Sequence, residues 1–287
     1  MARLGATFIA IGAQKCATTW LAAMLRQCPD VRVSQDKEVD FFSHHFDRGF
    51  EWYDRHFASD PARRHRGEIS PSYFIHRDAP ARAAAYDPGL QIFVILRDPV
   101  DRAYSNHLHE VRKGHVSGMN LRFEAALDNN PLYLDQGRYA THLRRWLDWF
   151  PPGQVHILFQ EDISRDGAEA ARRVTGGLDL PPLTSFIDLR TNESVRYRNA
   201  ALGETLWKIG NAARRRGLGH LVETVKAAPG IRQIRDANRQ SIRDVVAPMR
   251  ADTERRLTEF FTEEVAQLAP LIGRMPPWQR FGAARAA

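Results

Sequence analysis

Apolar positions along the chain alternate between short unbroken runs and helical spacings. Two runs are apolar on both faces and predict buried strands, at residues 8–11 and 91–97. Further strands are expected at 31–34, at 154–159 and from residue 67 to a turn near Pro71. Between them, apolar residues recur three or four positions apart, which predicts helices over 21–28, 50–57, 100–111, 139–150 and 161–174, and others through 268. This alternation predicts a single α/β domain over 1–287, with a mostly parallel central sheet flanked by helices.

The first strand-loop-helix unit carries the residues of an anion site. The strand closes at Gly12, and Lys15 and the hydroxyl pair Thr18 and Thr19 precede the helix. Backbone N–H groups at a helix N-terminus attract anions, and a lysine adds a full charge. The spacing is not that of a Walker A loop, G-x-x-x-x-G-K-S/T, because Lys15 comes three residues after Gly12. The alternative interpretation is an ordinary strand-turn-helix with a surface lysine.

A second candidate anion site follows the strand at 91–97. Asp98 can cap the next helix, with Pro99 at its first position. Arg97 at the strand end and Ser105 in the second helical turn could reach one ligand at the carboxyl edge of the sheet. Arginine offers bidentate donors to phosphate oxygens, and serine offers a hydroxyl. A capped helix with a surface serine is the alternative.

Composition narrows the protein class. The 287 residues are 43% hydrophobic, enough for a sizeable core, yet no stretch approaches about 20 apolar residues, so no membrane span is expected. No basic-then-apolar signal pattern occurs at the N-terminus. The two cysteines, Cys16 and Cys28, form no disulfide framework, which favours a reducing cytoplasm. No Cys/His cluster has zinc spacing, so no metal is expected.

The net charge of +7 is concentrated late in the chain. Between Arg190 and Arg256 there are 13 Arg and 2 Lys against 7 Asp and Glu. A basic face of this strength suggests an anionic cofactor, an acidic substrate or nucleic acid, or else a solvated helical surface. The stretch 203–250 is the best candidate for a helical appendage.

Both anion sites resemble those of the sulfotransferases that use 3′-phosphoadenylyl sulfate (PAPS). Residues 14–21 resemble the 5′-phosphosulfate loop, P-K-S/A/T-G-T-T-W/S-L, but depart from it at Gln14 and at Ala17, where the family usually has Pro and Gly. Residues 97–105 resemble the 3′-phosphate motif R-N/D-P-x-x-R-x-x-S. The resemblance implies a P-loop-kinase-like fold, PAPS as donor without a metal, and adenosine 3′,5′-bisphosphate as product. It implies these donor-binding residues: Gln14, Lys15, Cys16, Ala17, Thr18, Thr19, Trp20, Arg97 and Ser105.

Three further motifs resemble the glycan branch of that family, the heparan sulfate N- and 3-O-sulfotransferases and their bacterial relatives. They are K-E-x-x-F-F at 37–42, G-x-x-W-Y at 49–53 and E-x-S-x-x-Y-F at 68–74. By this resemblance Glu68 is the general base, and Lys37 supports the phosphosulfate side. The alternative for Glu68 is a carboxylate in a structural salt bridge. Alternative bases are His44, His45 and His107.

The later part of the chain resembles the family more weakly. Residues 192–198 resemble a basic loop that folds over the nucleotide, which implies that Arg196 or Arg198 contacts PAPS, although both could be solvated charges. The ending at 271–274 with Trp278 resembles the family's terminal helix and tryptophan.

The sequence therefore predicts transfer of a sulfuryl group from PAPS to a hydroxyl or amine of a saccharide, lipid or secondary metabolite. Lys15 and the loop N–H groups would stabilise the leaving phosphate, and Glu68 would accept the acceptor's proton. Two rival functions are a P-loop nucleotide kinase and a non-catalytic basic module that binds nucleic acid or another anion. A P-loop kinase would need the lysine spacing of a Walker A loop, which this chain lacks. A nucleic-acid-binding module would not explain the motifs upstream of the basic segment, so no nucleic-acid partner is expected.

Overall fold

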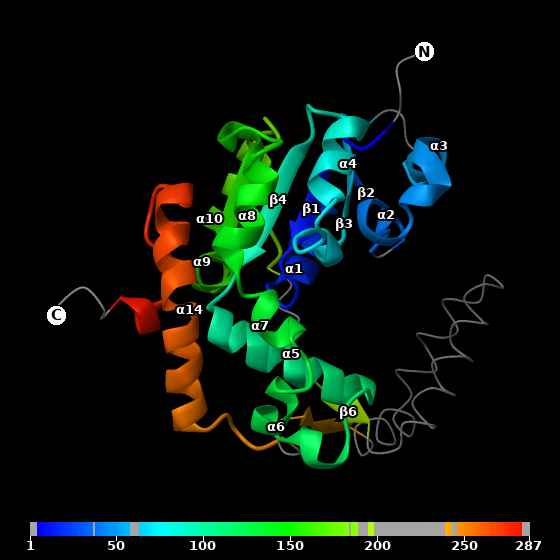
Figure 1. The fold of residues 1–287 in the computed structure, drawn as a ribbon. Coiled ribbons are helices and arrows are strands. Elements are labelled where there is room, and N and C mark those ends of the chain that lie inside the picture. Colours follow the sequence, from blue (N-terminus) through cyan, green and yellow to red (C-terminus); the bar gives the residue numbers. More distant parts are fainter. Residues whose placement is uncertain are drawn as a thin grey trace. The chain divides into compact units, whose positions relative to one another are not determined.

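Five strands form a fully parallel sheet in the order β2-β3-β1-β4-β5 (Figure 1). The computed structural model describes residues 5–36, 38–57, 63–183, 185–188, 195–197, 239–242 and 246–282. The strands of the sheet are β1 Phe8–Gly12, β2 Val31–Val33, β3 His65–Ile69, β4 Gln91–Leu96 and β5 Val155–Phe159. The predicted parallel sheet is confirmed. Its centre is buried, since β1 is buried along its whole length and β4 from its second residue.

Helices follow the strands in the alternation that the sequence predicts. Those described are α1 Thr18–Leu25, α2 Phe41–His44, α3 Gly49–Asp54, α4 Ala79–Tyr86, α5 Pro99–Lys113, α6 Phe123–Leu127, α7 Leu132–Asp135, α8 Tyr139–Leu147, α9 Gln160–Arg165, α10 Gly167–Gly176 and α14 Ala251–Ile272. A 3-10 turn at Pro71–Tyr73 ends the extended segment of β3, as the proline predicts. Among the described residues, no helix is both long and apolar enough to span a bilayer.

The single helix predicted over 161–174 is wrong. The structure has two helices, α9 and α10, separated at Asp166. The Asp166 carboxylate accepts a hydrogen bond of 2.9 Å from the N–H of Glu169, so it caps a new helix. The helical spacing of apolar residues continues across Asp166, so the sequence pattern did not indicate that a second helix begins there.

The chain divides into two compact units, which we describe separately. The first comprises Met1–Asn106, Leu127–Thr191 and Arg250–Ala287, and contains the five-stranded sheet. The second comprises His107–Ala126 and Asn192–Met249. In it, β6 Val195–Tyr197 pairs antiparallel with β7 Arg239–Ser241. Most of the expected appendage at 203–250 lies outside the described residues.

In the first unit, the three glycan-branch motifs meet in one aromatic cluster. Phe41 stacks on Tyr53 with ring centroids 4.5 Å apart. Phe42 contacts Tyr53 and Tyr73 edge to face, at 5.1 and 5.3 Å. All four rings are buried. The aromatic residues of these motifs therefore build the core around β3.

Candidate active site

The loop between β1 and α1, the first candidate anion site, has two residues with an unusual backbone conformation. Lys15 and Ala17 adopt left-handed φ angles of 68° and 60°. The N–H of Ala13 donates to the carbonyl of Ile95 at 2.8 Å, which holds the loop against the end of β4. Thr18 and Thr19 are the first residues of α1, where backbone N–H groups have no partner within a helix. Ala17, where the resembled motif usually has Gly, therefore occupies a position with a positive φ.

Two residues of this loop region turn their side chains into the protein. The Cys16 thiol is buried, and burial raises its pKa to about 11, so it stays protonated. The Trp20 indole donates to Asp188 Oδ1 at 3.1 Å and packs on Phe186. Neither side chain is available to a ligand in this arrangement, whereas Lys15 is half-exposed.

At the end of β4, Arg97 is half-buried, and among the described residues none accepts a hydrogen bond from its guanidinium. Asp98 Oδ1 accepts from the N–H groups of Val100 at 2.9 Å and Asp101 at 3.2 Å, which confirms the predicted helix cap. Ser105 lies half-buried in the second turn of α5.

The start of α5 is clamped from the C-terminal segment. Arg280 Nη1 lies 2.7 Å from Asp98 Oδ1, and its Nη2 donates to Glu254 Oε1 at 2.6 Å. Arg102 of the same motif is fully buried and donates to Gln136 Oε1 at 3.1 Å. Arg102 therefore holds α5 in place.

Tyr139 joins the two candidate anion sites, and the sequence analysis did not identify it. Its hydroxyl donates to the backbone carbonyl of Arg97 at 2.8 Å and lies 3.9 Å from Cys16 Sγ. Tyr139 was expected only as an apolar residue of its helix. Its hydroxyl could have indicated a positioning role, since the hydroxyl of a buried tyrosine usually has a hydrogen-bond partner.

Glu68 is completely buried in β3, at 0% exposure. Its Oε1 accepts hydrogen bonds from the hydroxyls of Tyr53, at 3.2 Å, and Tyr73, and its Oε2 accepts from Ser70 at 2.5 Å. Burial raises the pKa of Glu68 to about 7, against the opposing effect of the bonds from Ser70 and Tyr73. No ion pair to Glu68 is present among the described residues; its partners are hydroxyls.

Ser70 connects this buried carboxylate to the turn of the first glycan-branch motif. Its hydroxyl accepts from the N–H of Asp40 at 2.9 Å, and Ser72 donates to Asp40 Oδ1 at 2.5 Å. Asp40 and the exposed Glu38 both have left-handed φ angles, of 53° and 58°. Glu68 thus helps to hold a strained turn, a role that the motif spacing did not reveal. Lys37, from the same motif, lies outside the described residues.

The remaining candidates are not brought to these anion sites by any described contact. His107 is buried and bonded through Nε2 to the Leu121 carbonyl at 3.0 Å, and burial lowers its pKa. His44 and His45 contact the rings of His76 and Trp52. Arg196 lies in β6, but its side chain and the whole of Arg198 lie outside the described residues.

A lysine-bearing loop, a helix N-terminus and an arginine at adjacent ends of parallel strands are the arrangement of an α/β protein with a P-loop-like fold. The chain belongs to the sulfotransferase family, since the model of the sulfotransferase domain matches residues 6–219. The resemblance inferred from the motifs is confirmed.

Two named relatives come from the glycan branch. Heparan sulfate glucosamine 3-O-sulfotransferase 3B1 of Mus musculus is 34% identical over 178 residues, covering 60% of this chain and 45% of that protein. Bifunctional heparan sulfate N-deacetylase/N-sulfotransferase 3 of Homo sapiens is 31% identical over 206 residues, covering 65% of this chain and 24% of that protein. The match therefore spans less than half of either relative.

A solved structure shares the fold. The sulfotransferase from Alicyclobacillus acidocaldarius has a TM-score of 0.68 at 24% identity, covering 94% of this chain and 96% of its own. The expected P-loop-kinase-like sulfotransferase fold is confirmed.

Proposed function

We propose that the chain transfers a sulfuryl group from PAPS to a hydroxyl or amine group of an acceptor, leaving adenosine 3′,5′-bisphosphate. The observation that carries this proposal is the contact of the Tyr139 hydroxyl with both the Arg97 carbonyl, at 2.8 Å, and Cys16 Sγ, at 3.9 Å. Through it, the loop of Lys15 and the strand end of Arg97 lie side by side. Two adjacent anion sites suit a nucleotide with anionic groups at both its 5′ and 3′ positions.

The residues present fit the two ends of PAPS. The half-buried guanidinium of Arg97 has no described acceptor, and a phosphate would supply one. Ser105 would add a hydroxyl to the same 3′-phosphate. At the other end, the backbone N–H groups of residues 14–20 and the hydroxyls of Thr18 and Thr19 surround the N-terminus of α1.

When bound, PAPS supplies a sulfuryl group on a phosphate leaving group. Lys15 and the N–H groups at the start of α1 would stabilise the negative charge that develops on that phosphate. Arg97, Ser105 and the clamped start of α5 would fix the position of the nucleotide, so that acceptor and leaving oxygen are in line. Lys37 is proposed to support the phosphosulfate side, and Arg196 or Arg198 to contact the nucleotide. Neither a metal nor a nucleic acid has a role in this proposal.

Glu68 is the proposed final proton acceptor. Its carboxylate is fully buried, and so are Ser70, Tyr53 and Tyr73, whose hydroxyls donate to it, so binding of the acceptor would have to open this site before the proton reaches Glu68. A pKa of about 7 suits a general base that works near neutral pH.

A saccharide is the proposed acceptor class, since two relatives with different sulfotransferase activities are both named for heparan sulfate. Hydroxyls of lipids and secondary metabolites are the alternatives. We place the activity in a reducing cytoplasm, because Cys16 and Cys28 are both buried free thiols.

Calorimetry with adenosine 3′,5′-bisphosphate, ATP and duplex DNA tests the donor assignment. We expect the bisphosphate to bind far more tightly than ATP. Tighter binding of ATP would favour a kinase, and tighter binding of DNA a nucleic-acid module. A screen of acceptors with radiolabelled PAPS then tests the acceptor class.

A further inference from the structure

The peptide group between Arg97 and Asp98 is held at both of its polar atoms. Its carbonyl oxygen accepts a hydrogen bond of 2.8 Å from the Tyr139 hydroxyl. Its N–H donates to Glu161 Oε1 at 2.9 Å. Tyr139 begins α8, and Glu161 lies in the first turn of α9, directly after β5. Two separate helices therefore fix the peptide group that follows the Arg97 side chain.

Trp278 packs beside the groups that hold this peptide. Its ring lies 5.7 Å from that of Tyr139 and, edge to face, 5.5 Å from that of Phe159. Phe159 is the last residue of β5, two positions before Glu161. Trp278 is only 3% exposed, so bulk water does not reach its indole N–H.

The indole of Trp278 and the carboxylate of Glu161 complement each other. Trp278 Nε1 and Glu161 Oε2 are both buried, and neither has a hydrogen-bond partner among the described residues. One offers a proton and the other a lone pair. The two groups interact, because the indole lowers the pKa of the Glu161 carboxyl, against the larger effect of burial, which raises it. A direct bond or one bridging water between them would satisfy both.

The same C-terminal segment also holds the side chain of Asp98. Arg280, two residues after Trp278, lies 2.7 Å from Asp98 Oδ1. An ordinary helix cap accounts for the Asp98 carboxylate, which bonds the first N–H groups of α5. A cap does not require a second carboxylate on the preceding peptide, where burial of the charge costs free energy. The contact of Glu161 therefore calls for a further role.

We propose that Glu161 and Trp278 are positioning residues for the nucleotide, which hold the Arg97–Asp98 peptide so that the Arg97 guanidinium meets the 3′-phosphate. The inference rests on the proposed function. Neither residue needs to touch the ligand, since both act through the backbone of Arg97. A guanidinium on a fixed backbone loses less conformational freedom when it binds a phosphate, and this raises the affinity.

The charge of Glu161 and its hydrogen bond have opposite effects on phosphate binding. A negative charge near Arg97 would repel the phosphate, whereas the bond to the Asp98 N–H would favour its binding. Glutamine keeps an oxygen acceptor and removes the charge, while alanine removes both. A comparison of the two variants therefore separates the hydrogen bond from the charge.

The first measurement needs no ligand and follows amide hydrogen exchange at Asp98 by NMR. Glu161→Ala should speed this exchange about tenfold, the effect of losing one hydrogen bond to a charged group. Trp278→Phe, which keeps a ring and loses the N–H, should speed it several-fold. The matched control is Trp146→Phe, because the indole N–H of Trp146 is also buried and without a partner among the described residues. It should leave the exchange at Asp98 unchanged.

The second measurement is calorimetry with adenosine 3′,5′-bisphosphate and with AMP, which lacks the 3′-phosphate. Glu161→Ala should weaken bisphosphate binding about tenfold, and Trp278→Phe several-fold, while the affinity for AMP changes little. Glu161→Gln should bind the bisphosphate at least as tightly as the wild type. A merely structural role would lower both affinities together and leave the preference for the bisphosphate unchanged.

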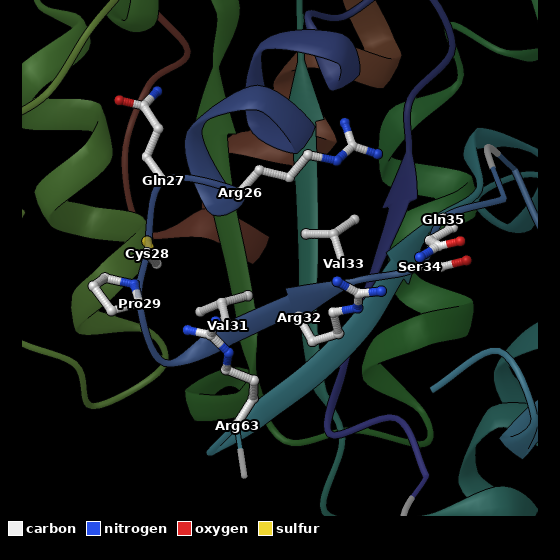
Figure 2. Close-up of a pocket in the computed structure, with 10 residues that line it drawn as sticks. All are labelled: Arg26, Gln27, Cys28, Pro29, Val31, Arg32, Val33, Ser34, Gln35 and Arg63. Atoms are coloured by element: carbon white, nitrogen blue, oxygen red, sulfur yellow. The ribbon is translucent and has the colours of Figure 1, made fainter. Parts of the chain in front are cut away.

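A cavity elsewhere on the sheet supplies a control for the place of binding. This polar cavity of about 520 Å³, whose lining includes Arg26, lies beside β2, at the edge of the sheet opposite β5 (Figure 2). Arg26→Gln alters an exposed side chain of the cavity and should leave bisphosphate binding unchanged. A loss in this variant would place the bisphosphate in the cavity and overturn the proposal.

The remaining outcomes also decide the proposal. Faster exchange at Asp98 with a smaller preference for the bisphosphate supports it. Unchanged exchange in Glu161→Ala overturns it, as do an unchanged preference, an equal effect of Trp146→Phe, or a loss in Glu161→Gln as large as that in Glu161→Ala. If Glu161→Ala unfolds, as melting would show, Trp278→Phe supplies the decisive variant. A wild-type chain that fails to bind the bisphosphate contradicts the proposed function instead, while exchange at Asp98 still reports on the peptide.

Discussion

The hydroxyl of Tyr139 donates to the backbone carbonyl of Arg97 at 2.8 Å, which ties α8 to the carboxyl end of β4. Tyr139 contacts the backbone and leaves the Arg97 guanidinium to other partners. It therefore positions the arginine without competing for it.

Tyr139→Phe should weaken the binding of adenosine 3′,5′-bisphosphate several-fold while the protein stays folded. The variant keeps the ring, which packs 5.7 Å from Trp278, and loses only a hydrogen bond worth about 1 kcal/mol. Calorimetry and thermal melting check both parts. A drop in melting temperature with unchanged nucleotide affinity would show that the bond serves stability alone.

Arg97→Ala should cost about 1.5–3 kcal/mol of binding to the bisphosphate, the range for a hydrogen bond to a charged group. Binding of AMP, which lacks the 3′-phosphate, should change little, so the preference for the bisphosphate should shrink. Equal losses for both nucleotides would place Arg97 elsewhere on the ligand.

Lys15→Ala should abolish most turnover with little effect on melting, because this half-exposed loop side chain contributes little to the core. Turnover is measured with radiolabelled PAPS and the best acceptor of the screen. A variant with wild-type kcat would contradict the role of Lys15 at the leaving phosphate.

Glu68→Gln should lower kcat by about 10² or more and remove the acid limb of the kcat/KM profile, which should lie near the pKa of about 7 in the wild type. Nucleotide affinity should change little. If rate and acid limb survive, Glu68 acts as a structural acceptor for the hydroxyls of Tyr53, Tyr73 and Ser70.

The dependence of the free energy of unfolding on pH gives an independent measurement of the pKa of Glu68. Burial raises the pKa of Glu68 from 4.5 to about 7, so its protonated form is favoured in the folded state. Its contribution to stability is thus fully present below pH 4.5 and is lost as pH rises through 7. The wild type should lose stability relative to Glu68→Gln across this window, as urea unfolding can measure. Parallel curves would contradict the raised pKa.

Ala17→Gly should stabilise the protein by about 0.5 kcal/mol. A left-handed φ of 60° strains alanine by about 1–2 kcal/mol, and the greater freedom of glycine in the unfolded chain offsets part of the gain. The control Ala22→Gly, inside α1, should destabilise by about 1 kcal/mol. Urea unfolding compares them, and destabilisation by both variants would argue against strain at Ala17.

The sequence predicted the sheet well because its central strands are continuous apolar runs, which have few alternatives to burial. The cap of α5 by Asp98 was equally visible, since that contact spans three residues. Local patterns of this kind need no knowledge of the rest of the fold.

The environment of Glu68 could not be predicted, because it depends on hydroxyls that two separate segments bring to β3. Tyr53 comes from α3, and Tyr73 is the last residue of the 3-10 turn Pro71–Tyr73. Motif spacing identified the candidate site residues, but the exposure of their side chains could be determined only from the tertiary structure.

The clamp of Arg280 on Asp98 also has a consequence for biosynthesis. A ribosome makes the strand and helix that carry Arg97 and Ser105 long before it makes Glu254 and Arg280, which complete the clamp. Domains generally fold as units during synthesis, from the N-terminus onward. Under the proposed function, the nascent chain should therefore acquire tight nucleotide binding only after residue 280 has left the exit tunnel.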